Sequence, residues 1–173
     1  MPTSLYDVSV GCYLQTLGAV EGFLDKGCAH CGANDIDLTE VVETRLYPDM
    51  LPFQFQIVSV AHHSLGAMKG VQAGLFAPPP PGPDLDFDGL QKLVADARSE
   101  LQQYTREAVG ELEGKEVEFR IGERSMTFTA EDFLMSFSLP NFYFHAATAY
   151  DILRMKGAPI GKRDFMGQLR LKS

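Results

Sequence analysis

Two histidines lie where an apolar helix face is expected, and a polar side chain there is unusual. His62 falls on an apolar stripe of a predicted helix that begins at Pro52, and His145 follows Asn141 by four residues, so these two share one face of a later helix. Two imidazoles on facing helices, together with an amide oxygen, can hold a divalent metal ion and leave positions for water. The alternative is that each histidine is a hydrogen-bonded residue of the core or of an interface. His63 is about 100° away around the helix from His62, and we expect it to be exposed.

Cys28 and Cys31, with His30 between them, form a second candidate site. A Cys-x-x-Cys pair binds zinc or cycles between dithiol and disulfide. A structural zinc site needs four ligands, and the sequence has no second pair of this kind. A redox motif is expected between a strand and a helix, whereas this pair follows the predicted end of a helix. The alternative, two small side chains that pack in a turn, is therefore favoured.

A third group of candidate residues lies on the last predicted helix. Asp151 and Arg154 are three residues apart, which places them for an ion pair. On an exposed face such a pair adds only about 0.3–0.5 kcal/mol of stability. In a cleft, Arg154 can instead hold the carboxylate of a substrate. We therefore take Tyr150, Asp151 and Arg154 as the candidate residues for binding a small-molecule ligand. No catalytic residue is assigned, because the sequence has no phosphate loop, nucleophile elbow or dinucleotide fingerprint.

Four predicted helices must position these residues. Apolar residues recur at alternating steps of three and four, which predicts helices at about 5–26, from Pro52 to about Gly70, over Leu90–Ala108, and through Asn141 to about Lys156. Asp49 is placed to cap the second of them. Four helices of this kind make a bundle, which builds its sites from side chains that face inward on neighbouring helices.

Two further segments have their own patterns. Apolar residues alternate with charged ones from Val117 to Ile121, and Gly122-Glu123 suits a two-residue turn, so a small β-hairpin is expected between helices 3 and 4. The segment Ala77–Pro83 has five prolines within its last six residues and favours extended polyproline geometry. We interpret it as a spacer along the bundle; the alternative is a motif for a polyproline-binding partner. The predicted fold is thus mainly α, a four-helix bundle with a small hairpin, in one domain over residues 1–173.

Composition narrows the classes of partner. The chain has 173 residues and a formal net charge of −8, and an acidic surface repels phosphate backbones, so no nucleic-acid partner is expected. No apolar run approaches the roughly 18 residues that span a bilayer, so no membrane partner is expected either. The N-terminus lacks the basic region of a signal peptide, and three cysteines are an odd number, which favours reduced thiols and a cytoplasmic location.

Several short segments, spread over nearly the whole chain, resemble a known family. This is an uncharacterised bacterial and fungal family, a domain of unknown function grouped with the DinB/YfiT-like metalloenzyme bundles. The resemblance is carried by these segments: Leu139–His145, Thr148–Arg154, Tyr6-Asp7, Tyr47–Met50 with Pro52 and Gln56, Met126–Thr129, and Gly157-x-Pro159-x-Gly161-Lys162. It covers nearly the whole chain, and the C-terminal motif is specific.

The resemblance implies an up-down-down-up four-helix bundle, in which the proline segment is the long connection between two parallel helices. It also implies a homodimer and a metal site made by one histidine on helix 2 and a His-x-x-x-His pair on the last helix. His62 matches the first of these and His145 the last, whereas Asn141 stands in place of the remaining histidine. We therefore expect a degenerate metal-dependent enzyme that binds Zn, Ni or Mn in a polar pocket between helices 2 and 4. The alternative is a non-catalytic homodimeric binding or structural protein without metal.

Overall fold

The computed structural model describes residues 3–79 and 84–172, and these residues are mainly helical. The helices in chain order are α1 (Leu5–Val8), α2 (Val10–Ala33), α3 (Leu38–Glu43), α4 (Phe53–Ala61), the π-helix η1 (His62–Gly66), α5 (Ala67–Ala73), α6 (Phe87–Leu101), α7 (Arg106–Gly110), α8 (Ala130–Asp132), the π-helix η2 (Phe133–Ser138), α9 (Leu139–Met155) and α10 (Lys162–Met166). The strands are β1 (Leu75–Phe76), β2 (Glu116–Ile121) and β3 (Arg124–Thr129).

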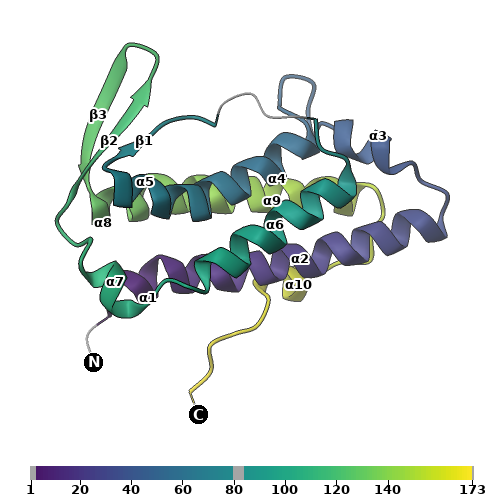
Figure 1. The fold of residues 1–173 in the computed structure, drawn as a ribbon. Helices are drawn as coiled ribbons and strands as arrows, with labels where there is room; N and C mark the ends of the chain where they lie inside the picture. Colours follow the sequence, from purple (N-terminus) through teal and green to yellow (C-terminus); the bar gives the residue numbers. More distant parts are fainter. Residues whose placement is uncertain (1–2, 80–83, 173) are drawn as a thin grey trace.

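Four long helical segments form the bundle: α2, the continuous run α4–η1–α5, α6, and the continuous run α8–η2–α9. In Figure 1, α2 and α9 run in one direction along the bundle, whereas α4–α5 and α6 run in the other. The order is therefore up-down-down-up, and the predicted fold class is confirmed. The end of α5 and the start of α6 therefore lie towards opposite ends of the bundle. The prolines of residues 80–83, to which part of the spacer prediction refers, lie outside the described residues.

The predicted hairpin is one part of a three-stranded sheet of order β1-β2-β3. β2 and β3 pair antiparallel from Glu116 opposite Thr129 to Ile121 opposite Arg124, and Gly122 has a φ of 57°, as the turn requires. β1 adds a parallel strand that pairs Phe76 with Phe119. The hairpin prediction missed this strand, because two residues after a helix carry no alternation from which a strand can be predicted.

The first predicted helix differs from the observed one at both ends. The capping box of Ser4 and Asp7 begins α1, but the chain leaves helical geometry at Ser9, where α1 ends and α2 begins. The helix was expected to end near Gly27, yet α2 continues to Ala33. Gly27 lies in its interior because the Leu153 side chain packs there, 3.0 Å from where a Cβ would be. The prediction that Asp49 caps the second helix is also wrong, since Pro52 is the N-cap of α4 and no side-chain cap hydrogen bond is formed.

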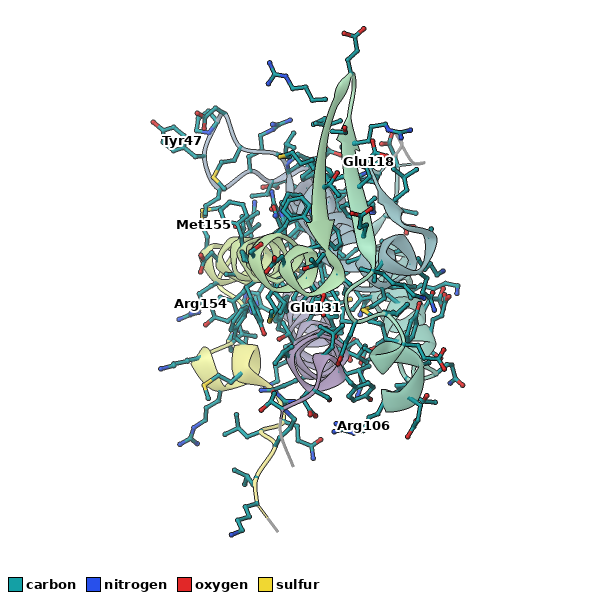
Figure 2. The ribbon with its side chains drawn as sticks, turned by 90° about the vertical axis from the view of Figure 1, so that its left-hand side faces the viewer. Tyr47, Arg106, Glu118, Glu131, Arg154 and Met155 are labelled. Carbon is teal, nitrogen blue, oxygen red and sulfur yellow. The ribbon has the colours of Figure 1, made fainter. Side chains whose placement is uncertain are left out.

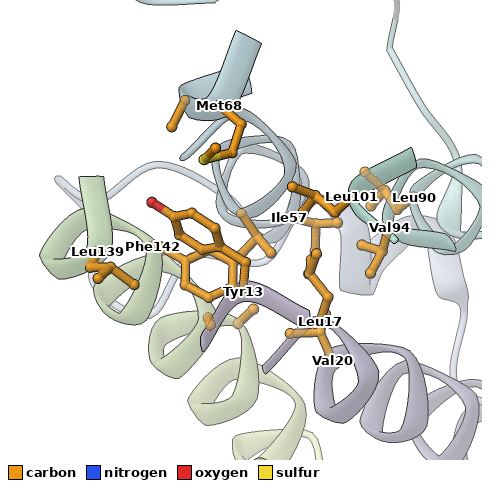
Figure 3. Packing of buried hydrophobic residues seen from close by; sticks show 14 of the residues in the cluster. Tyr13, Leu17, Val20, Ile57, Met68, Leu90, Val94, Leu101, Leu139 and Phe142 are labelled. Carbon is orange, nitrogen blue, oxygen red and sulfur yellow. The ribbon is translucent and has the colours of Figure 1, made fainter. Parts of the chain in front are cut away.

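The core lies where the long helices meet. Figure 3 shows Tyr13 and Leu17 of α2 beside Ile57 of α4 and Phe142 of α9, with side chains of α6 completing the packing. Tyr13 and Phe142 meet edge to face, with ring centroids 5.1 Å apart. None of the helices described is both long and apolar enough to cross a membrane.

Candidate functional site

Three imidazole rings lie in a row between η1 and α9, and we call His62, His63 and His145 the imidazole cluster. The rings of His63 and His145 are nearly parallel, with an interplanar angle of 15° and centroids 5.8 Å apart. His62 lies on the other side of His63, with ring centroids 5.5 Å apart. His63 therefore joins the two histidines that the sequence analysis singled out.

His145 is oriented by a buried amide. Its Nδ1 is 2.8 Å from Oε1 of Gln56, whose side chain is 2% exposed. The Gln56 Nε2 donates to the Leu51 carbonyl oxygen at 2.8 Å, which fixes the amide with its oxygen towards the imidazole. Because that oxygen only accepts, Nδ1 of His145 carries the proton, and Nε2 presents a lone pair. In metal sites, a hydrogen bond of this kind to one ring nitrogen of a histidine fixes the tautomer and orients the other nitrogen.

His62 is engaged with the connection that follows α5. Its Nε2 lies 2.9 Å from the Ala77 carbonyl oxygen and donates to it, and its ring lies against Phe76 with centroids 4.5 Å apart. Its Nδ1 faces the helix backbone, 3.1 Å from the position of a Cβ on Gly66. Both ring nitrogens of His62 are therefore directed at nearby backbone.

His63 was expected to be exposed, and this expectation is wrong. The residue is half-buried, and its Nδ1 is buried without a hydrogen-bond partner among the described residues. The physical reason is the π-helix η1. Its i→i+5 hydrogen bonds add a residue to the turn, and this changes the direction in which the side chains point. π-Helical segments are frequent at functional sites. The regular 3.6-residue spacing used for the sequence prediction could not reveal η1, and so it could not place His63 in the site.

A buried hydroxyl ties η1 to the helix opposite. Ser138, the last residue of η2, donates its hydroxyl to the His63 carbonyl oxygen at 2.6 Å. The same hydroxyl accepts a hydrogen bond from the Tyr13 hydroxyl at 3.0 Å, and both Tyr13 and Ser138 are fully buried. Two π-helical segments thus meet through one serine, which positions the backbone that carries His63.

The imidazole cluster is neutral at neutral pH. Burial lowers the pKa of His63 to about 3, and the neighbouring His62 and His145 lower it further. Burial lowers the pKa of His145 to about 4. It also lowers the pKa of His62, where the hydrogen bond to Ala77 acts in the opposite direction. Neutral imidazoles with free lone pairs can bind a metal ion or accept a proton.

Asn141 lies on the same helix as His145, but its amide turns back along that helix. Its Nδ2 donates to the Phe137 carbonyl oxygen at 2.7 Å. Within the described part of the chain, no group of three or more His, Cys, Asp or Glu side chains is arranged to hold a metal ion. His63 and His145 are close to each other and neutral, and each neutral imidazole has one nitrogen with a lone pair. His62 and Asn141, as placed, donate to backbone carbonyls instead.

The candidate substrate-binding residues lie further along α9, near its C-terminal end. The Tyr150 hydroxyl donates to the Ile160 carbonyl oxygen at 3.3 Å, and Arg154 donates to the Ala158 carbonyl oxygen at 2.8 Å. Asp151 is exposed. Tyr150 and Arg154 therefore hold the segment that follows the helix; a role of the three residues in substrate binding stays a prediction.

The two cysteines of the Cys-x-x-Cys motif lie within α2, not in a turn after it. Cys31 is buried, Cys28 is half-buried, and both are free thiols. Burial raises the pKa of the Cys31 thiol, and the neighbouring Cys28 adds to this effect. The His30 imidazole between them turns away to the Lys156 carbonyl oxygen, 3.3 Å from Nε2. These observations agree with a packing role, and a raised thiol pKa disfavours the reactive thiolate.

Comparison with known proteins gives one family and one fold. A family model described as "Domain of unknown function (DUF1993)" matches residues 5–166. The chain is similar to a solved structure described as a DinB family member from Shewanella denitrificans, with a TM-score of 0.81 and 21% sequence identity over 98% of this chain and 95% of that one. At this identity the likeness shows the fold alone. No curated protein matches the chain.

Proposed function

The chain belongs to the family described as Domain of unknown function (DUF1993), and from this premise we propose that the imidazole cluster is its functional centre. In this proposal a divalent ion, Zn, Ni or Mn, binds there and serves a metal-dependent enzyme reaction on a small molecule. The observation that carries the proposal is the pairing of His63 with His145, two neutral imidazoles with ring centroids 5.8 Å apart.

The ligand set follows from which nitrogens have lone pairs. His145 offers Nε2, because its Nδ1 proton is held by Gln56. His63 offers its buried Nδ1, which has no partner among the described residues. Asn141 would add a weak oxygen ligand only after its amide turned from the Phe137 carbonyl oxygen, to which its Nδ2 donates. His62, the first histidine of the predicted set, would join them only after leaving the Ala77 carbonyl.

The surrounding residues prepare this centre. Gln56 keeps the lone pair of His145 on Nε2, and Ser138 fixes the backbone of His63. Phe55 and Phe137 pack against the edges of His145 and His63, with ring centroids 5.8 Å apart in each pair, and limit the access of water. A divalent ion bound there lowers the pKa of a coordinated water or thiol towards neutrality, which makes a nucleophile available.

Metal titration tests the proposal. Chelator-treated protein is titrated with Zn²⁺, Ni²⁺ and Mn²⁺ by calorimetry, alongside His63→Ala, His145→Ala and the control His30→Ala, whose imidazole lies on α2 against Lys156. We expect one site in the wild type and in the control, and a loss of affinity of about tenfold or more in each of the other variants. Equal binding by all four proteins, or binding by none, contradicts the proposal.

A second candidate function, a homodimeric binding protein without metal, rests on a different observation. Large apolar side chains are exposed on α9 and on the loop before α4: Phe144 is 56% exposed, Met155 54% and Tyr47 66%. Figure 2 shows Tyr47 and Met155 on the same side of the molecule. Exposed apolar surface of this kind is typical of an interface between protein chains.

The oligomeric state tests the second candidate, since a homodimeric binding protein requires a dimer whether or not metal binds. Light scattering of the wild type is expected to give twice the mass of the chain, and Phe144→Glu is expected to give the mass of one chain. Lys69→Glu, a charge change on α5, is the control and keeps the mass of the wild type. A single-chain mass for the wild type at all concentrations contradicts the homodimer.

A further inference from the structure

A cleft of about 620 Å³ lies away from the imidazole cluster, between α2, α6 and the C-terminal segment after α10. A wider hollow continues it across Asp7, Arg106 and Arg170, which line both. The cleft brings together Arg98 of α6, Arg106 of α7 and Arg170 of the C-terminal segment. Three guanidinium groups in one cleft are notable in a chain whose net charge is −8.

Two glycines make room for these side chains against α2. Gly11 and Gly18 are seven residues apart and so lie on one face of the helix. A Cβ on Gly11 would be 2.8 Å from Nη1 of Arg170, and a Cβ on Gly18 would be 3.4 Å from the guanidinium of Arg98. Glycine destabilises a helix interior, so its presence at both positions is explained by the guanidinium groups that lie on the helix backbone.

The charges of the cleft are only partly compensated. Arg98 donates from Nη1 to Glu21 at 2.6 Å, while its Nε is buried without a partner among the described residues. Arg106 donates to the Asp7 carboxylate at 2.6 Å. Arg170 reaches a backbone carbonyl oxygen, that of Asp7, at 3.3 Å. Among the residues that the structure describes, two carboxylates therefore stand against three guanidinium groups, and several guanidinium N–H groups have no acceptor, since each guanidinium has five.

We propose that this cleft binds a small organic anion, whose carboxylate or phosphate group is held by Arg170, while Arg98, about two helical turns further along α2, adds positive charge to the same cleft. The guanidinium fork matches the oxygen atoms of either group in two parallel hydrogen bonds. Tyr6 and Leu14, which also line the cleft, provide apolar surface for the rest of the molecule. The volume lies in the range of small-molecule sites. The proposal is independent of metal binding at the imidazole cluster.

Two probes and two kinds of variant test this site. Benzoate and inorganic phosphate are titrated into the wild-type protein by calorimetry at low ionic strength. Arg170→Gln removes the charge, whereas Gly11→Ala keeps the charge and displaces the guanidinium, and alanine favours the helix at that position. Arg124→Gln, on the β-hairpin, is the control with the same change of charge.

We expect saturable binding of at least one probe by the wild type and by the control, and about tenfold weaker binding by both cleft variants. Tighter binding of benzoate identifies an apolar carboxylate as the ligand class, and tighter binding of phosphate identifies a phosphate ester. The proposal is overturned if neither probe saturates the wild type below about 10 mM, or if both cleft variants bind as the wild type does.

Discussion

The imidazole of His63 stacks on that of His145, with centroids 5.8 Å apart and an angle of 15° between the rings. The two residues come from helices that are distant in sequence, and the contact depends on the π-helical turn at His63 and on the amide that orients His145. Three parts of this arrangement, the amide, the charge state and the serine link, each lead to a prediction.

Replacing Gln56 by leucine is expected to destabilise the protein. It is also expected to leave the imidazole proton of His145 no longer fixed on Nδ1. The variant leaves Nδ1 of His145 and the Leu51 carbonyl oxygen without these partners, which costs about 1–3 kcal/mol. Urea unfolding measures the loss, and ¹⁵N shifts of the His145 ring report the tautomer. Gln54→Leu, two residues earlier on α4 and half-buried, is the control, and an equal loss there would refute the role given to Gln56.

Stability is expected to fall as the pH drops below about 6.5. The pKa of His145 is about 4 in the folded protein and near its ordinary value of 6.5 when unfolded, so the unfolded state binds the proton first. The stabilisation is complete above pH 6.5 and is lost progressively towards pH 4. Urea midpoints at several pH values measure this. His145→Gln is expected to reduce the dependence and His30→Gln to leave it unchanged; an unaltered slope in His145→Gln would count against burial as its cause.

Replacing Ser138 by alanine is expected to cost about 2–3 kcal/mol, because it leaves both the His63 carbonyl and the Tyr13 hydroxyl unpaired in the core. Ser136→Ala, at an exposed position of η2, is the control with a small effect. In a double-mutant cycle, Tyr13→Phe and Ser138→Ala are expected to be non-additive, since they remove one network. Additive losses would show that the two hydroxyls act separately.

Two glycines are expected to respond to alanine with opposite signs. Gly74 ends α5 with a φ of 71° before β1 begins, so an alanine there costs about 1–2 kcal/mol. Gly22 lies inside α2 with open space around its Cβ position, so an alanine there adds about 0.5–1 kcal/mol. Unfolding curves of the two variants compare the effects, and destabilisation by Gly22→Ala would contradict the helical assignment.

The sequence was sufficient for the architecture because the apolar periods are long. Steps of three and four residues locate the four long helical segments, although the third helix ends at Leu101 and not at the predicted Ala108. Thr129 is the N-cap of α8, which begins the segment that leads into α9. The site could be predicted only in part. His62 and His145 were found because they interrupt apolar stripes. His63 was wrongly expected to be exposed, because the direction of its side chain depends on η1, which departs from α-helical spacing. Gln56 could not be assigned to His145 at all, since their contact is set by the packing of α4 on α9.

The most direct test of the central claim is the ¹⁵N spectrum of the histidine rings during titration with Zn²⁺. The chain has four histidines, so each ring can be followed separately. We predict that the ring nitrogens of His63 and His145 shift together and reach a limit at one equivalent, while those of His30 do not move. Unchanged resonances of His63 and His145 at excess Zn²⁺ would contradict the account.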